Sequence, residues 1–191
     1  MMKYASGLLL ALCLLLVSYS GSYSADKKSS GTHAEPDQFP VPANVPGLLF
    51  YIQRDPNTNT ICYQLNMDEQ GHLSEKNPVN MFWIRYPEGG GRKELNYLQR
   101  KFAYGINAKA TGKSTYELRS VAYSKLPLYL RRDNKNEYHV YASIDNKQCI
   151  LSRVFIRIDG GTFWSPNVLY IELKGTEIAT GKTIVQRIKP S

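Results

Sequence analysis

Arginines occur on predicted strands at positions where the other residues of the same face are apolar. Arg54 continues the apolar alternation of residues 48–52, and Arg85 continues that of residues 79–83. Successive side chains of a strand point to opposite faces, so each arginine shares a face with apolar residues. A guanidinium on such a face must be paired or must face a water-filled cavity. We therefore predict a ligand site at the mouth of a barrel, suited to a carboxylate or phosphate group and formed by Arg54, Arg85, Arg100 and Tyr104.

The same arginines have a second interpretation. They can lie at strand ends, where their long stems reach solvent, or they can pair with acidic residues that hold the fold together. Arg153 and Arg157 interleave with apolar residues in the same manner on a later segment. The alternation by itself therefore leaves a binding site and a set of structural arginines as alternatives.

Signatures of catalysis are weak. Beyond the N-terminal region the histidines are His72, in a turn after Gly71, and His139, on the less apolar face of a predicted strand. Neither belongs to a nucleophile elbow, and no pair of carboxylates suited to glycoside hydrolysis is recognisable. We therefore predict no catalytic residue and favour a non-catalytic protein, with a hydrolase that uses His139 as an alternative.

Two segments, Gly112-Lys113-Ser114 and Gly181-Lys182-Thr183, end like a phosphate-binding P-loop. That motif also needs a glycine five residues before its second glycine, where this chain has Asn107 and Thr176. Neither segment leads into a convincing helix. Both are predicted to be turns between strands, and we expect no cofactor.

Cys62 and Cys149 fall within predicted strands. They form a possible disulfide if those strands are neighbours, because an exported protein resides where disulfides persist. Two separate buried thiols fit the sequence equally well. The chain has no Cys-x-x-Cys motif and three histidines, so we expect no metal site.

The N-terminus has the pattern of a secretory signal peptide. Lys3 precedes the apolar run of residues 5–17, and Ser22-Tyr23-Ser24 fits a cleavage site. We predict a signal peptide at residues 1–24, a disordered tether at residues 25–46 and one β-rich domain at residues 47–191. The mature protein is thus expected to be exported, periplasmic or secreted, without a transmembrane segment.

From residue 47 onward, short alternating segments are separated by turn residues at regular spacing. Residues 92–102 differ, because Leu95, Leu98 and Phe102 form an apolar stripe that predicts a short helix packed on a sheet. No alternation of strands and helices points to a parallel α/β fold. The sequence therefore predicts a mainly β fold, an antiparallel meander barrel or a β-sandwich of about nine or ten strands with one short helix.

The formal net charge of +8 can favour nucleic acid or anionic surfaces. The basic residues are scattered among strands and turns without a run of five, which is typical of a solvated surface. Export also argues against nucleic acid, so we expect no nucleic-acid partner. An unknown small ligand or an envelope protein are the partners considered.

Several segments together carry a resemblance to a known family. They are LFYIQR at 49–54, NTNT at 57–60, PV at 78–79, FWIRY at 82–86, QR at 99–100 and AYG at 103–105. Over residues 47–190 the chain resembles a bacterial exported family catalogued only as a domain of unknown function, domain of unknown function 4833. The resemblance implies a single exported bacterial domain and brings no activity, cofactor or catalytic residue with it. Its motif residues include Arg54, Arg85, Arg100 and Tyr104.

The sequence thus favours an exported, non-catalytic binding module for a small anionic or amphipathic ligand or a protein partner. The alternative from another class is an envelope structural or accessory protein without a small-molecule site.

Overall fold

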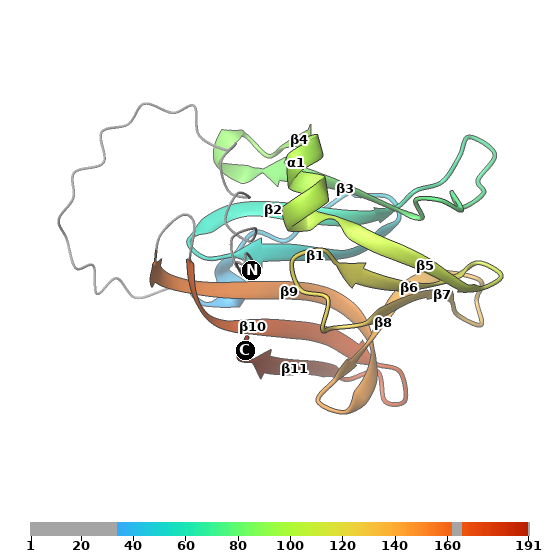
Figure 1. Ribbon diagram of the computed structural model, residues 1–191. Coiled ribbons are helices and arrows are strands. Elements are labelled where there is room, and N and C mark those ends of the chain that lie inside the picture. Colours follow the sequence, from blue (N-terminus) through green and yellow to red (C-terminus); the bar gives the residue numbers. More distant parts are fainter. Residues whose placement is uncertain (1–33, 162–165, 191) are drawn as a thin grey trace, which may run out of the picture.

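A computed structural model describes residues 34–161 and 166–190, and within these residues eleven strands form one curled sheet (Figure 1). The strands are β1 (Leu48–Arg54), β2 (Asn57–Leu65), β3 (Val79–Arg85), β4 (Gly91–Glu94), β5 (Ile106–Gly112), β6 (Thr115–Ser120), β7 (Leu128–Arg132), β8 (Tyr138–Ile144), β9 (Lys147–Gly161), β10 (Pro166–Glu177) and β11 (Thr183–Ile188). The helical elements are the 3₁₀ turns η1 (Pro36–Gln38) and η2 (Tyr86–Glu88), the one-turn helix α1 (Tyr97–Gln99) and the π-helical turn η3 (Arg100–Tyr104). The predicted fold class, mainly β with one short helix, is confirmed.

The long strand β9 organises the sheet. Its residues 147–150 pair with β8 and its residues 153–156 pair with β1, while β10 pairs along its other edge. Two arms, β1-β2-β3-β4 and β8-β7-β6-β5, therefore leave the same edge of β9 and curl into a half-barrel, with β11 beyond β10 (Figure 1). Among the described strands only β1 and β9 are parallel neighbours; this pairing of strands far apart in the sequence departs from the expected antiparallel pattern.

The two arms enclose the main core. Phe50 stacks on Tyr63 with ring centroids 4.3 Å apart. Apolar side chains of both arms belong to the same buried cluster, among them Ile61, Met81 and Trp83 from one arm and Leu118, Leu130 and Val140 from the other. A smaller cluster on the opposite face of the first arm contains Cys62, Phe82 and Ile84. The alternation of the strands thus buries both faces of β2 and β3, as expected for β3.

The prediction of a helix at residues 92–102 is wrong for residues 92–94, and the predicted apolar stripe is not buried along its length. Residues 91–94 form β4 instead, because they pair with β3. The helix begins after Asn96, whose side chain accepts a hydrogen bond from Gln99 N (2.8 Å), while Gln99 Oε1 accepts one from Asn96 N (3.0 Å). Leu95 is buried, but Leu98 and Phe102 are 38% and 40% exposed, so the predicted stripe does not form a buried face.

The N-terminal strap, residues 34–46, lies within the range expected to be a disordered tether. In the structure it is ordered against the outer face of the sheet. Phe39 is 5% exposed and meets Phe155 edge to face at 5.0 Å. Arg153 Nη1 donates to Pro36 O (3.0 Å), and Arg157 Nη2 donates to Ala34 O (2.8 Å). The few apolar residues of this segment suffice because buried guanidinium groups hold its backbone.

The two segments that end like a P-loop are turns between strands, as predicted. Residues 113–114 connect β5 to β6, and residues 181–182 precede β11. In the described part of the chain no helix has the length and apolar character needed to cross a membrane. The expected signal peptide at residues 1–24 lies outside the described residues.

Candidate functional site

The two arms of the half-barrel do not pair with each other where β3 and β5 face each other, and a groove lies along this opening. β4 pairs only with residues 82–85 of β3, so the first half of β3 faces β5 across this opening. A pocket of about 570 Å³ and an adjoining one of about 280 Å³ share residues of β3 and β5. We call this continuous depression the seam groove.

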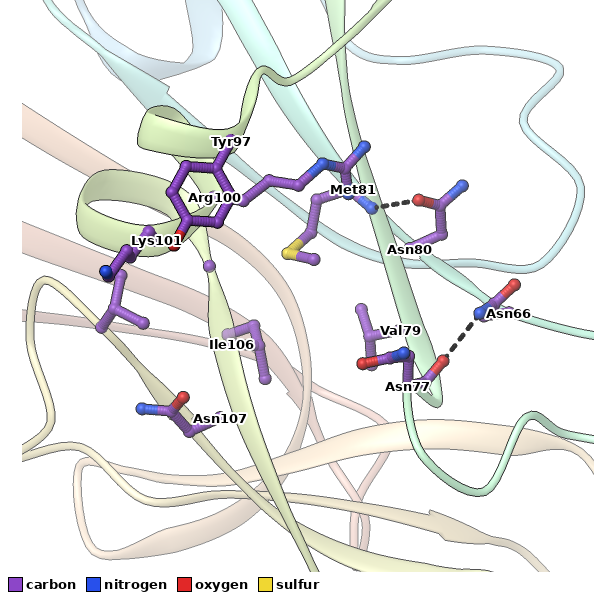
Figure 2. A pocket seen from close by; sticks show the side chains of 12 residues that line it. Asn66, Asn77, Val79, Asn80, Met81, Tyr97, Arg100, Lys101, Ile106 and Asn107 are labelled. Carbon is purple, nitrogen blue, oxygen red and sulfur yellow. Dashed lines mark hydrogen bonds between the residues drawn. The ribbon is translucent and has the colours of Figure 1, made fainter.

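The floor of the seam groove is apolar. Figure 2 shows Val79 and Met81 of β3 and Ile106 of β5 extending into the space between the two strands. Val79 and Met81 are 5% and 9% exposed and belong to the main core. The floor is therefore fixed by the packing that holds the two arms together.

The rim of the groove is polar and basic. Its amide side chains are Asn66, Asn77, Asn80 and Asn107, and its cations are Lys76, Arg100 and Lys101. No carboxylate lines the groove among the residues that the structure describes. A concave site with an apolar floor and converging polar groups is the usual form of a ligand site.

Local hydrogen bonds fix part of this rim. Asn66 Nδ2 donates to Asn77 O (2.8 Å), and Asn80 Oδ1 accepts from Met81 N (2.9 Å) (Figure 2). These bonds orient amide groups at the edge of β3. On the facing strand β5, the side chain of Asn107 is exposed.

Arg100 reaches the groove from η3. Its Nε donates to Leu95 O (3.0 Å), and its Nη2 donates to Glu94 Oε2 (2.7 Å). These two bonds hold the guanidinium in place, and its remaining N–H groups can still donate. Lys101, from the same turn, lies 5.5 Å from the Tyr97 ring centroid and 5.2 Å from that of Phe102.

The four residues predicted to form one site come from three places in the fold: Arg100 and Tyr104 from η3, Arg54 from the end of β1 and Arg85 from the end of β3. Of these four, only Arg100 lines the seam groove. Arg54 ends β1 beside Asn57 in the β1–β2 hairpin, and Arg85 ends β3 and pairs with Glu88 of η2.

Tyr104 has a structural position. Its ring meets Trp83 edge to face at 5.0 Å, and its carbonyl accepts from Tyr63 Oη (2.9 Å). These contacts fasten the end of η3 to the inner face of the sheet, next to the groove.

Sequence reasoning missed the asparagines and lysines of the rim. Their signal was modest: Asn66 follows β2, Asn77 and Asn80 lie just before and within β3, and Asn107 lies near the start of β5. Their convergence depends on the pairing of β1 with β9, which no local pattern reveals.

The arginines of β9 follow the structural interpretation. Arg157 Nη1 pairs with Asp55 Oδ2 (3.1 Å), and Arg153 Nη2 pairs with Glu172 Oε1 (2.9 Å), with all four side chains only 4% exposed. Arg187 Nε also contacts Glu172, at 2.8 Å. Each ion pair is satisfied, as buried charges require.

The possible disulfide is not formed. Cys62 and Cys149 are free thiols. Cys62 belongs to the smaller cluster, and Cys149 belongs to the main core. β1 lies between β2 and β9, so the two cysteine-bearing strands are not neighbours, and the alternative of two separate buried thiols describes the structure. Burial raises the pKa of Cys62 to about 12 and also raises the pKa of Cys149.

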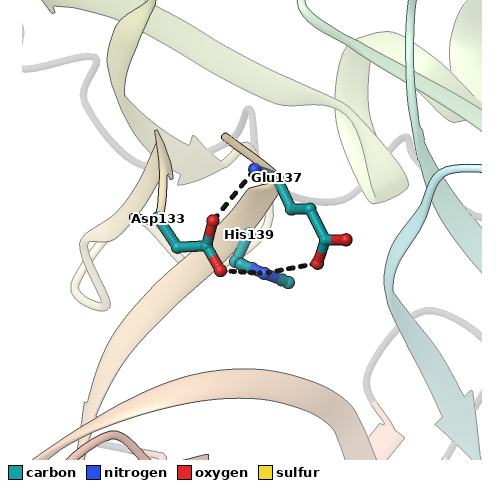
Figure 3. A group of neighbouring side chains, drawn as sticks. All are labelled: Asp133, Glu137 and His139. Carbon is teal, nitrogen blue, oxygen red and sulfur yellow. Dashed lines mark hydrogen bonds and ion pairs between the residues drawn. The ribbon is translucent and has the colours of Figure 1, made fainter. Parts of the chain in front are cut away.

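His139 is part of a small cluster at the β7–β8 hairpin (Figure 3). Its Nε2 lies 3.3 Å from Asp133 Oδ2 and 3.9 Å from Glu137 Oε2. Asp133 also accepts backbone bonds from Glu137 N and Lys135 N, and these bonds hold its pKa below the usual value. One imidazole and two carboxylates are chemically able to bind a divalent cation.

None of these three side chains lines the seam groove. Asp133 closes the hairpin turn through its backbone contacts, and His139 stacks edge to face with Tyr141 at 6.2 Å. These contacts describe a hairpin brace that lies outside the seam groove.

Comparison with known families identifies the chain. The model of the family described as Domain of unknown function (DUF4833) matches residues 50–187. The chain belongs to this family. No curated protein and no solved structure matches the chain.

Proposed function

We propose that this member of the family is a non-catalytic binding module that holds an anionic ligand in the seam groove. The observation that carries the proposal is the composition of the groove: cations and amides surround an apolar floor, and no described carboxylate lines it. An anion entering the groove meets these donors, and Arg100 keeps its pair with Glu94 (2.7 Å) at the edge of the groove.

The groups of the rim have complementary tasks in this proposal. Arg100 and Lys101 supply charge, and charge-assisted hydrogen bonds to a carboxylate or phosphate are the strong ones. The amides of Asn80 and Asn107 can donate to or accept from neutral parts of the ligand. The floor at Met81 can cover an apolar portion, which favours an amphipathic ligand over a bare ion.

A second candidate function rests on a different observation. Tyr97, Leu98 and Phe102 are 69%, 38% and 40% exposed and occupy neighbouring turns of α1 and η3. Exposed apolar residues that gather on one element are typical of protein contacts. An envelope structural or accessory protein that docks through this helical face is the alternative.

Export remains part of the proposal. It rests on the amino-acid pattern of residues 1–24, which resembles a secretory signal. N-terminal sequencing of the protein from fractionated cells tests it. A mature chain that begins after Ser24 is expected, and an intact Met1 in a cytoplasmic fraction would contradict export.

Nuclear magnetic resonance titrations with phosphate, acetate and glucuronate test the proposed site. Backbone amide shifts are expected to change at the groove, at Met81, Lys101 and Ile106. Lys101→Met should weaken binding about fivefold, since one close ion pair in water is worth about 1 kcal/mol. Lys135→Met, in the β7–β8 turn outside the groove, removes the same charge and serves as control.

Shifts that scatter over the basic surface, or that respond equally to both lysine variants, would refute the groove as the site. In that case the helical face of the second candidate would be tested by sedimentation of Leu98→Glu and wild-type protein with envelope fractions.

A further inference from the structure

The β3 side of the seam groove carries backbone groups that the sheet does not use. Asn66 N donates to Pro78 O (3.0 Å), so residue 78 is bonded toward β2. In an antiparallel ladder the direction alternates, which turns the amide and carbonyl groups of Val79 and Met81 away from β2. Leu65, opposite Val79, confirms the alternation because its N–H donates to Gly47 O (2.9 Å) and not to β3.

The β5 side has the same property. Val121 N donates to Gly105 O (3.0 Å), so residue 105 is bonded toward β6. The register of β5 on β6 then turns the backbone groups of Ile106 and Ala108 toward the groove. Among the described strands, β5 has β6 as its one neighbour. Two strand edges with unused donors and acceptors thus line the same depression.

One of these donors is bonded to a side chain. Met81 N is bonded to the side chain of its neighbour Asn80, at 2.9 Å, and not to another strand (Figure 2). A side-chain acceptor on a rotatable bond can give way to a carbonyl of an incoming chain. The Met81 N–H of β3 therefore has a hydrogen-bond partner, although no described strand covers this part of the β3 edge.

The directions of the two edges suit an added strand. β3 is separated from β1 by two antiparallel steps, β5 is separated from β9 by four, and β1 is parallel to β9. β3 and β5 therefore run in the same sense along the sheet. A chain between them can be antiparallel to both, which is the more stable pairing.

We propose that the seam groove binds an extended, acidic peptide segment as an additional strand between β3 and β5. This inference rests on the proposed function and specifies its ligand. Charge complementarity selects an acidic segment, because Lys76 and Lys101 lie along the groove and no described carboxylate lines it. Arg100 also lines the groove, and part of its charge is offset by its pair with Glu94. Alternate apolar side chains of the segment lie on the floor formed by Val79 and Ile106.

The length of the segment follows from the edges. Val79–Met81 and the facing residues 106–108 offer about three residues of pairing on each side, which a strand of roughly 10 Å spans. Flanking acidic side chains then reach Lys76 at one end of the groove and Lys101 at the other. A hexapeptide contains the whole recognition unit.

Fluorescent hexapeptides with blocked ends provide the test. They alternate Val or Tyr with a polar residue, which is Glu in one set, Ser in the second and Lys in the third. Fluorescence polarisation at low salt is expected to give at least roughly tenfold tighter binding for the Glu set than for the Lys set. N-methylation of two alternate amides, which removes donors and keeps every side chain, should weaken the best binder about tenfold.

Two proline variants test the protein side. Ala108→Pro removes one N–H that points into the groove and none that pairs with β6. Binding should therefore fall about threefold, half the free-energy loss expected for the two donors of the N-methylated peptides. Ala110→Pro removes the equivalent N–H of the same edge outside the groove and serves as control. Circular dichroism establishes that both variants are folded, and the N-methylated peptides decide the matter if either is not.

The outcomes separate the two proposals. If N-methylated and unmodified peptides bind equally, or the Glu set has no advantage, strand addition is wrong. If peptides of every set fail while phosphate, acetate or glucuronate shifts the groove resonances, the groove is an anion site and the peptide inference alone is overturned. If neither peptides nor small anions bind, the proposed function fails as well.

Discussion

Glu172→Gln is expected to lower the free energy of unfolding substantially, because it strips a buried arginine of its counter-charge. The carboxylate of Glu172 accepts from Arg153 Nη2 (2.9 Å) and Arg187 Nε (2.8 Å), and the side chain is only 4% exposed. Breaking one member of a buried ion pair destabilises a protein by about 3–5 kcal/mol. We expect a value near 3 kcal/mol, since Arg153 keeps its bond to Pro36 O and its contact with the exposed Asp37.

Urea denaturation followed by tryptophan fluorescence measures this difference. Glu117→Gln is the matched control, because Glu117 pairs with Arg119 at a more exposed position, and its loss should change stability by less than about 1 kcal/mol. A double variant that also carries Arg153→Met tests the reason. It should be more stable than Glu172→Gln alone, since the unpaired buried charge has been removed. Equal stability of Glu172→Gln and wild type would refute the account of the buried network.

Three further predictions concern the strap, a thiol and the hairpin brace. Phe39→Ala should destabilise the fold by about 3 kcal/mol, while Val41→Ala, at a 62% exposed position, should change it by less than about 0.5 kcal/mol; similar values in urea denaturation would show that the strap is not packed. Cys62, whose burial raises its pKa to about 12, should resist iodoacetamide at pH 8 until urea unfolds the chain, as peptide mapping would reveal; rapid native alkylation is the contrary result. The pKa of Asp133 is lowered in the folded state, so its contribution to stability is present above the unfolded carboxyl pKa and is lost as pH falls through the folded pKa. Asp133→Asn should therefore flatten the decrease of stability measured between about pH 5 and 2. An unchanged decrease would contradict the role of Asp133 as a brace.

Much of the fold is readable from local patterns. Alternation and turn residues located most strands, because a strand buried on one or both faces must place apolar side chains at a period of two. The boundary at residues 91–96 was misread, since the stripe of Leu95, Leu98 and Phe102 has helical spacing while pairing with β3 draws the preceding residues into β4. Tertiary pairing overrode the local period there.

The candidate site was predictable only in character. The sequence indicated arginines on apolar faces, and Arg100 does line the groove. Arg54 and Arg85 lie at the ends of β1 and β3, away from the groove. The arginines of β9 form ion pairs with acidic residues distant in the sequence, such as Arg157 with Asp55. Which of several similar arginines finds an internal partner depends on contacts across many residues, and no periodicity encodes them.

By itself the amino-acid sequence determined that this chain builds a β-rich domain with one short helix and a basic surface, since these follow from side-chain period, turn residues and net charge. The tertiary structure decided where the chain stays open. The parallel pairing of β1 with β9 sends two arms from one strand edge, and their curl brings β3 and β5 to either side of a groove without joining them. That juxtaposition is a property of the whole sheet, because each local segment would pair equally well in a closed barrel.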